Sequence, residues 1–167
     1  RNVILIPFWL PGEPEHLRYS DHEWWFEGFL GTEVVIFAGP SITTGISKLN
    51  NLEIVKIKTD SLKFSLEQIE KDLNLNFSIS IDSIDLIWHV LEISATCRVH
   101  DLDMVTCPKV AVIADIHHTH RPLSSLINYI NNQSYTHVAC THNQYTPFFK
   151  VLCNLEAFKF PYFYKKP

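Results

Sequence analysis

Residues 115–120 read Asp-Ile-His-His-Thr-His and bring one carboxylate and three imidazoles into a short stretch of chain. Histidine titrates closest to neutral pH, so such a segment can supply a general base for the deprotonation of a hydroxyl group. We expect Asp115 or His117 to be this base and His118 to contact the substrate. A capping role for Asp115 and a surface or packing role for each histidine are the alternatives.

A metal centre is a further interpretation, because aspartate and histidine are good ligands for zinc, manganese and iron. The spacing Asp-x-His after a predicted strand resembles the opening motif of metallophosphatases. That family needs Gly-Asp and Gly-Asn-His-Asp motifs further along the chain, and neither occurs after Asp115. A metal-dependent hydrolase built on Asp115, His117 and His142 stays an alternative, but we expect no bound metal.

The elements that must position these groups follow from the alternation of apolar runs with helix-like segments. Such alternation is typical of a parallel sheet covered on both faces. It predicts an α/β fold, a Rossmann-like three-layer sandwich with a mostly parallel sheet. We expect one domain over residues 1–160, with a linker or tail at 161–167. The predicted strands are residues 2–9, 33–38, 52–58, 85–90, 109–115, 136–140 and 156–160.

Helix signals occur between several of these strands. Ser65 begins a capping-box pattern with Gln68, and Pro122 suits the first turn of a helix that runs to about residue 132. Further helices are predicted after Asp21 and over residues 144–153. The alternation over 52–58 favours an edge or half-exposed strand. Residues 40–51 and 91–108 are expected to be irregular.

Ligands of Rossmann-like sheets bind beyond the carboxyl ends of the strands, at the point where the strand order reverses. The residues that follow the predicted strands are therefore candidates for substrate binding. For His89 a hydrogen-bonded place at the edge of the core is the alternative, and for Asn143 it is helix capping. Besides His118, these substrate-binding candidates are Trp9, Pro11, Gly12, His89, His142 and Asn143.

Composition and motifs exclude several other classes of protein. The net charge of −4 and the single adjacent pair of basic residues, Lys165-Lys166, argue against nucleic-acid binding. No apolar run approaches the ~20 residues that cross a bilayer. Neither a GxGxxG nor a GxxxxGK[ST] motif is present, so dinucleotide and P-loop phosphate binding are unsupported. Four cysteines without a CxxC pair indicate reduced thiols in a cytoplasmic protein.

The second half of the chain resembles the N-terminal half of GT-B-type glycosyltransferases, including the spore-maturation-type bacterial branch. The resemblance is carried by the run 108–115, by His117-His118, and by a later strand followed by Thr141-His142 and Tyr145-x-x-Phe148-Phe149. It spans roughly residues 84–163, and Phe160-Pro161 matches the position of the linker to a second domain.

The resemblance implies transfer of a sugar from a nucleotide-activated donor to an acceptor hydroxyl, usually without a bound metal. The nucleotide sugar would be a cosubstrate, and no other cofactor is implied. This chain would supply the acceptor side and bind a carbohydrate or glycosylated acceptor, while a C-terminal domain of a longer parent would bind the donor. We expect no turnover without that domain. The alternative from another class is a stand-alone Rossmann-like binding or interaction domain that docks another protein.

Overall fold

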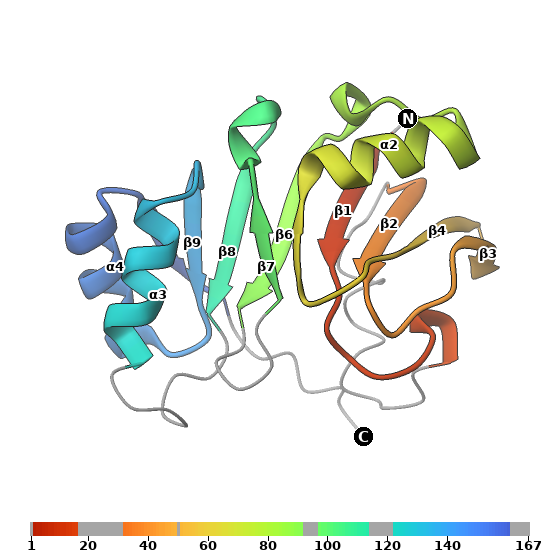
Figure 1. Ribbon diagram of the computed structural model, residues 1–167. Helices are drawn as coiled ribbons and strands as arrows, with labels where there is room; N and C mark the ends of the chain where they lie inside the picture. Colours follow the sequence, from red (N-terminus) through yellow and green to blue (C-terminus); the bar gives the residue numbers. More distant parts are fainter. Residues whose placement is uncertain (1, 17–31, 50, 92–96, 114–121, 161–167) are drawn as a thin grey trace, which may run out of the picture.

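The computed structural model describes residues 2–16, 32–49, 51–91, 97–113 and 122–160. Its main feature is an eight-stranded sheet with the order β10-β9-β8-β6-β1-β2-β4-β3 (Figure 1). The strands are β1 (Val3–Pro7), β2 (Val34–Gly39), β3 (Gly45–Leu49), β4 (Leu52–Lys58), β6 (Leu86–Leu91), β8 (Lys109–Ile113), β9 (His137–Cys140) and β10 (Glu156–Lys159).

All neighbouring strands of this sheet pair in parallel except β3, which pairs antiparallel with β4. With β3 left out and the other strands renumbered along the chain, their order across the sheet is the Rossmann order 3-2-1-4-5-6. Strand β10 extends this order beyond the sixth strand. The order reverses between β1 and β6, which lie side by side at the centre of the sheet. The predicted α/β class with a mostly parallel, Rossmann-like sheet is confirmed.

Both faces of the sheet are buried in apolar side chains. Helices α2 (Leu66–Phe77), α3 (Pro122–Asn131) and α4 (Thr146–Cys153) lie over the same face, in front of the strands in Figure 1. The opposite face packs against Phe8 and Ile42 and against the half-buried Trp9. Burial on both sides explains why β1, β2 and β8 are continuous apolar runs rather than alternating ones.

Local signals set the starts of α2 and α3 where they were predicted. Ser65 caps α2, since its hydroxyl oxygen accepts a hydrogen bond from the Gln68 amide at 3.2 Å. The helix ends at Ser78 in the left-handed conformation. Pro122 is the first residue of α3, as its fixed φ and missing amide favour. Helix α4 begins two residues later than predicted.

Short elements were missing from the prediction. Strand β3 lies within the supposedly irregular residues 40–51 and covers the side of β4, so β4 is not an edge strand. Residues 91–108 contain β7 (Arg98–His100), which pairs in parallel with β5 (Lys63–Ser65) as a separate two-stranded sheet. The 3-10 turns are η1 (Pro14–His16), η2 (Ile81–Ser83), η3 (Leu102–Met104) and η4 (Asn143–Tyr145).

The helix predicted after Asp21 falls outside the described residues, as does the predicted tail 161–167. Among the helices that are described, none has the length and apolar character that a membrane span requires.

Candidate functional site

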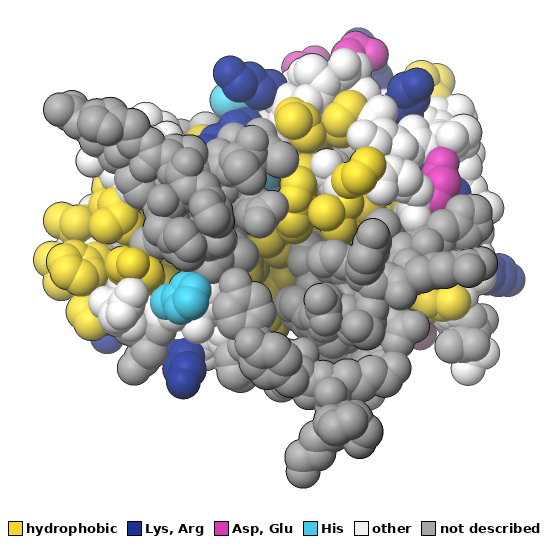
Figure 2. Space-filling model, turned by 90° about the horizontal axis from the view of Figure 1, so that it is seen from below, with side chains coloured by type: hydrophobic (Ala, Val, Ile, Leu, Met, Phe, Trp, Pro, Cys, Tyr) yellow, Lys and Arg dark blue, Asp and Glu magenta, His cyan; other side chains and the backbone are white. Residues whose placement is uncertain are grey.

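The carboxyl ends of the seven parallel strands meet at one edge of the sheet, which Figure 2 shows face-on. Hydrophobic side chains are uncovered near the centre of this face and on the side where α3 and α4 lie. The reversal of strand order between β1 and β6 places the expected ligand crevice at this edge. The loop that leaves β1, residues 8–16, is the described segment next to that point and is called the β1 loop below.

The β1 loop carries three of the predicted substrate-binding residues. Trp9 is half-buried and packs against the apolar clusters of both faces of the sheet, so it lies at their common rim. Pro11 and Gly12 are exposed. Gly12 has a φ of 93°, a conformation that side chains other than glycine rarely adopt. The structure thus places Trp9, Pro11 and Gly12 after β1 at the carboxyl edge, and their role in substrate binding stays a prediction.

Backbone contacts fix where the β1 loop starts. The Phe8 amide donates a hydrogen bond to the Ala38 carbonyl at 2.8 Å, which extends the pairing of β1 with β2 by one residue. At Gly39 a Cβ atom would lie 2.0 Å from the Phe8 carbonyl oxygen. Because backbone cannot yield as a flexible side chain can, this close approach requires glycine at position 39.

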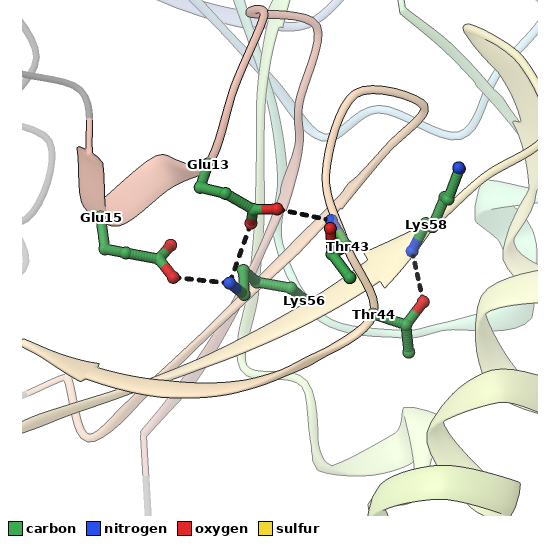
Figure 3. Close-up of polar contacts among 6 residues, drawn as sticks. All are labelled: Glu13, Glu15, Thr43, Thr44, Lys56 and Lys58. Atoms are coloured by element: carbon green, nitrogen blue, oxygen red, sulfur yellow. Dashed lines mark hydrogen bonds and ion pairs between the residues drawn. The ribbon is translucent and has the colours of Figure 1, made fainter.

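A partly buried ion cluster holds the far end of the β1 loop. The Lys56 ammonium lies 2.8 Å from Glu13 Oε2 and 2.5 Å from Glu15 Oε1 (Figure 3). The second oxygen of Glu13 accepts a hydrogen bond from the Thr43 amide at 2.9 Å. We call Glu13, Glu15, Thr43 and Lys56 the Lys56 cluster. It joins the β1 loop, the β2–β3 connection and β4.

The charges of the Lys56 cluster stabilise one another. Lys56 is only 8% exposed, and burial alone would lower its pKa. Hydrogen bonds to Glu13 and Glu15 outweigh that effect and raise the pKa of Lys56. Burial would raise the pKa of both carboxyl groups, but their bonds with Lys56 lower it instead. All three groups therefore stay charged at neutral pH.

No sequence pattern indicated this cluster. Lys56 occupies a polar position in an alternating strand, which predicts exposure to solvent. Its side chain lies on the same side of β4 as the buried Ile54, and it is covered because the β1 loop returns over β4.

The end of β9 places His142 on the same edge of the sheet, but farther out. His142 is exposed and its ring contacts Tyr145 edge-on, with 6.3 Å between ring centroids. Three strand spacings of about 4.8 Å separate β9 from β1, so the strand ends that precede His142 and the β1 loop lie about 14 Å apart. Thr141 is buried, and its hydroxyl group donates a hydrogen bond to the Ile113 carbonyl. Asn143 begins η4 and is not the N-cap residue of α4, because Tyr145 occupies that position.

His89 is not part of this edge, which corrects the expectation that it contacts a ligand. Strand β6 continues to Leu91, so His89 lies within the strand and is completely buried. Its Nδ1 lies 2.6 Å from the Tyr135 hydroxyl and its Nε2 lies 3.0 Å from the Cys97 carbonyl. Burial lowers the pKa of His89 to about 3. The alternative interpretation, a hydrogen-bonded histidine of the core, matches this geometry.

Asp115, His117 and His118 lie outside the described residues, in the connection between β8 and α3. The proposed base is therefore placed only by its position in the chain, directly after a strand that ends at the carboxyl edge. Among the described residues, no group of three or more His, Cys, Asp or Glu side chains could hold a metal ion.

A cavity of about 500 Å³ opens at the opposite, amino edge of the sheet. Asp85 and Cys107 line it, but the Asp85 carboxylate is bound to the backbone of β1 and the Cys107 thiol is not activated. Asp85 accepts a hydrogen bond from the Val3 amide at 2.8 Å, and burial raises the pKa of the Cys107 thiol. This cavity is therefore a weaker candidate than the carboxyl edge.

The chain gave no significant match to models of known protein families, to curated proteins or to solved structures. The function is therefore inferred from the geometry of the carboxyl edge. Trp9 is a half-buried aromatic residue, the β1 loop is exposed at Gly12, and His142 is an exposed histidine farther out. Such groups suit a polar ligand that carries flat apolar faces and many hydroxyl groups.

Proposed function

We propose that this chain is the acceptor-side domain of a GT-B-like glycosyltransferase. The enzyme would transfer a sugar from a nucleotide-activated donor to a hydroxyl group of the acceptor. The observation that carries the proposal is the position of Trp9, Pro11 and Gly12, directly after β1 at the reversal of a Rossmann strand order. The arrangement from β8 through α3, β9 and α4 to β10 agrees with the strand and helix order of the resemblance.

In this proposal Trp9 stacks against a sugar ring of the acceptor, as aromatic side chains do with the apolar faces of sugars. His142 lies about 14 Å away by strand spacing, farther than a single sugar ring reaches. The preferred acceptor is therefore an oligosaccharide or another glycosylated molecule that extends along the carboxyl edge from the β1 loop toward β9.

The chemical step requires a base at the acceptor hydroxyl. Asp115 or His117 would accept the hydroxyl proton as the acceptor oxygen bonds to the anomeric carbon and the nucleotide leaves with the electron pair of the broken bond. Both residues follow β8, which is two strand spacings, or about 10 Å, from β1. The nucleotide sugar would be bound mainly by a separate donor-binding domain, so the base alone does not make this chain active.

Binding of neutral oligosaccharides tests the acceptor role on this chain directly. Maltotriose, cellotriose and chitotriose serve as probes in isothermal titration or ligand-observed NMR. We expect at least one to bind, with Trp9→Ala weakening binding about tenfold or more and Trp9→Phe retaining part of it. The exposed Phe158, on β10, is the control, and Phe158→Ala should bind as the unchanged protein does. The acceptor role is contradicted if none of the three probes binds, or if Trp9→Ala leaves their affinity unchanged.

The base is tested in the polypeptide that contains the donor-binding domain. Asp115→Ala and His117→Ala are compared for transfer, with acceptor binding measured in parallel. We expect one of them to lower kcat about 10²- to 10⁴-fold while acceptor binding persists. If both variants transfer sugar at the unchanged rate, neither Asp115 nor His117 is the base.

A binding or interaction domain is the second candidate, favoured by an exposed apolar patch. Phe148, Val151 and Leu152 of α4 are each more than half exposed, and Phe158 of β10 is 40% exposed. Patches of this kind often contact other proteins. If Phe148→Ser and Leu152→Ser abolish a protein contact while the sugar probes never bind, this second function replaces the first.

A further inference from the structure

Residues 8–16 leave β1 at the proposed acceptor site, and the means by which this loop is held decides how Trp9 is presented. Pro7, Pro11 and Pro14 restrict the loop locally, since each fixes its own φ. Polar contacts with the sheet anchor the loop at its start and at its end. The Phe8 amide bonds to Ala38 at its start, and Glu13 and Glu15 bond to Lys56 at its end. Trp9, Pro11 and Gly12 lie between these two anchors.

The second anchor is unusual in its charge balance. Two carboxylates share one ammonium, and their side chains are 22%, 15% and 11% exposed for Glu13, Glu15 and Lys56. Removing the ammonium would leave two poorly hydrated negative charges close to each other, whereas removing either carboxylate would leave a balanced pair. The loop end is therefore most sensitive to Lys56, the one member that belongs to the sheet.

Lys56 also links the β1 loop with the neighbouring connection. Glu13 uses one oxygen for Lys56 and the other for the Thr43 amide in the β2–β3 connection (Figure 3). The Thr43 amide is exposed to solvent apart from this bond, so its hydrogen exchange reports whether Glu13 is in place.

We infer that Lys56 is a positioning residue of the site: through Glu13 and Glu15 it fixes the β1 loop in the conformation that presents Trp9 at the carboxyl edge. This inference rests on the proposed function for the identity of the ligand but not for the behaviour of the loop. A loop already held in its binding conformation loses little entropy on binding. Lys56 therefore affects acceptor affinity without touching the acceptor.

Hydrogen exchange of the whole chain tests the loop by itself. We compare Lys56→Met, which retains most of the side-chain volume, with Lys56→Arg, which retains the charge. Lys58→Met on the same strand is the matched control because Lys58 contacts Thr44 through its backbone amide only. We expect the Thr43 amide and the amides of residues 8–16 to exchange about tenfold or more faster in Lys56→Met. Lys56→Arg should restore part of the protection, and Lys58→Met should change nothing.

Unchanged exchange in a folded Lys56→Met variant overturns the inference and assigns the loop geometry to its prolines and apolar contacts. If Lys56→Met does not fold, Glu13→Gln and Glu15→Gln are compared instead, and each should raise exchange in residues 8–16 by a smaller factor. An unchanged rate in both overturns the inference as well.

A second measurement keeps this result apart from the proposed function. Maltotriose, cellotriose and chitotriose are titrated into Lys56→Met, with Lys56→Arg and Lys58→Met beside it. Faster loop exchange together with weaker binding of a probe supports both proposals. Faster exchange where no probe binds even the unchanged protein supports the positioning role and counts against the acceptor role. Faster exchange with undiminished affinity overturns the effect of Lys56 on binding.

Discussion

The hydroxyl group of Tyr135 donates a hydrogen bond to Nδ1 of His89, over 2.6 Å, within the core. The direction follows from the other ring nitrogen. Nε2 faces the Cys97 carbonyl at 3.0 Å, and a carbonyl only accepts, so Nε2 carries the proton and Nδ1 accepts. The Tyr129 hydroxyl lies 3.2 Å from that of Tyr135 and bonds to the backbone of Val99. This chain of contacts joins β6, β7 and α3.

Replacement of Tyr135 by phenylalanine should therefore destabilise the fold. Tyr135→Phe leaves Nδ1 of a fully buried histidine without its donor, and an unsatisfied buried polar group costs about 1–3 kcal/mol. Urea unfolding followed by circular dichroism measures the loss. Tyr145→Phe is the control, because Tyr145 is half-buried and its ring contacts the ring of His142 edge-on. Equal stability of the two variants would contradict the network.

The low pKa of His89 makes stability depend on pH. Burial lowers it from about 6.5 to about 3, so below pH 6.5 the unfolded chain binds a proton that the folded chain does not. The contribution of the neutral His89 to stability is complete above the pKa of the unfolded chain, about 6.5, and is lost as the pH decreases from about 6.5 toward 3. The contribution approaches about 1.4 kcal/mol per pH unit. Free energies of unfolding for the unchanged protein and His89→Gln, measured across this range, should differ by that slope. His142→Gln should keep it, and parallel curves for His89→Gln would refute the assignment.

Glycine at position 39 should be required for the β1 loop. A Cβ at Gly39 would meet the Phe8 carbonyl oxygen at 2.0 Å, so Gly39→Ala must displace the start of the loop, at about 1–3 kcal/mol or more. Nothing lies within 4 Å of a Cβ at Gly45, which makes Gly45→Ala a matched control expected within about 0.5 kcal/mol of the unchanged protein. Thermal unfolding of both variants measures the difference. Similar melting temperatures would show that the loop has room to move.

The four cysteines, all free thiols, should differ in reactivity. Cys97 is buried, and burial raises its pKa to about 12, so little thiolate forms at pH 8. Cys107 and Cys153 are half-buried with smaller increases in pKa. Alkylation by iodoacetamide, followed by mass spectrometry, should modify Cys107 and Cys153 first and Cys97 only upon unfolding. Early modification of Cys97 in the folded protein would contradict its placement.

Much of the fold could be predicted from the sequence because local signals and burial agree. The run at 110–113 is apolar throughout and belongs to a parallel strand inside the sheet, and Ser65 and Pro122 set helix starts through caps and backbone geometry. Strand β3 could not be predicted in this way. Its residues Gly45–Leu49 are mostly exposed and lack an apolar run, so only pairing with β4 makes them a strand.

The candidate site was predictable only in part, for a related reason. Trp9, Pro11 and Gly12 follow a strong strand, and the rule for parallel sheets places them correctly at the carboxyl edge. His89 was misplaced because β6 extends two residues beyond it, which no local signal marks. Lys56 was missed because its burial depends on glutamates more than forty residues earlier in the chain.

The place at which an acceptor binds decides whether the carboxyl edge is the acceptor site. Backbone chemical shifts of the isotope-labelled chain, recorded during titration with the oligosaccharide that binds best, locate it on the sheet. We expect shifts at Trp9, Gly12 and His142, on the carboxyl edge. Shifts confined to Asp82, Asp85 and Cys107 around the amino-edge cavity would contradict it.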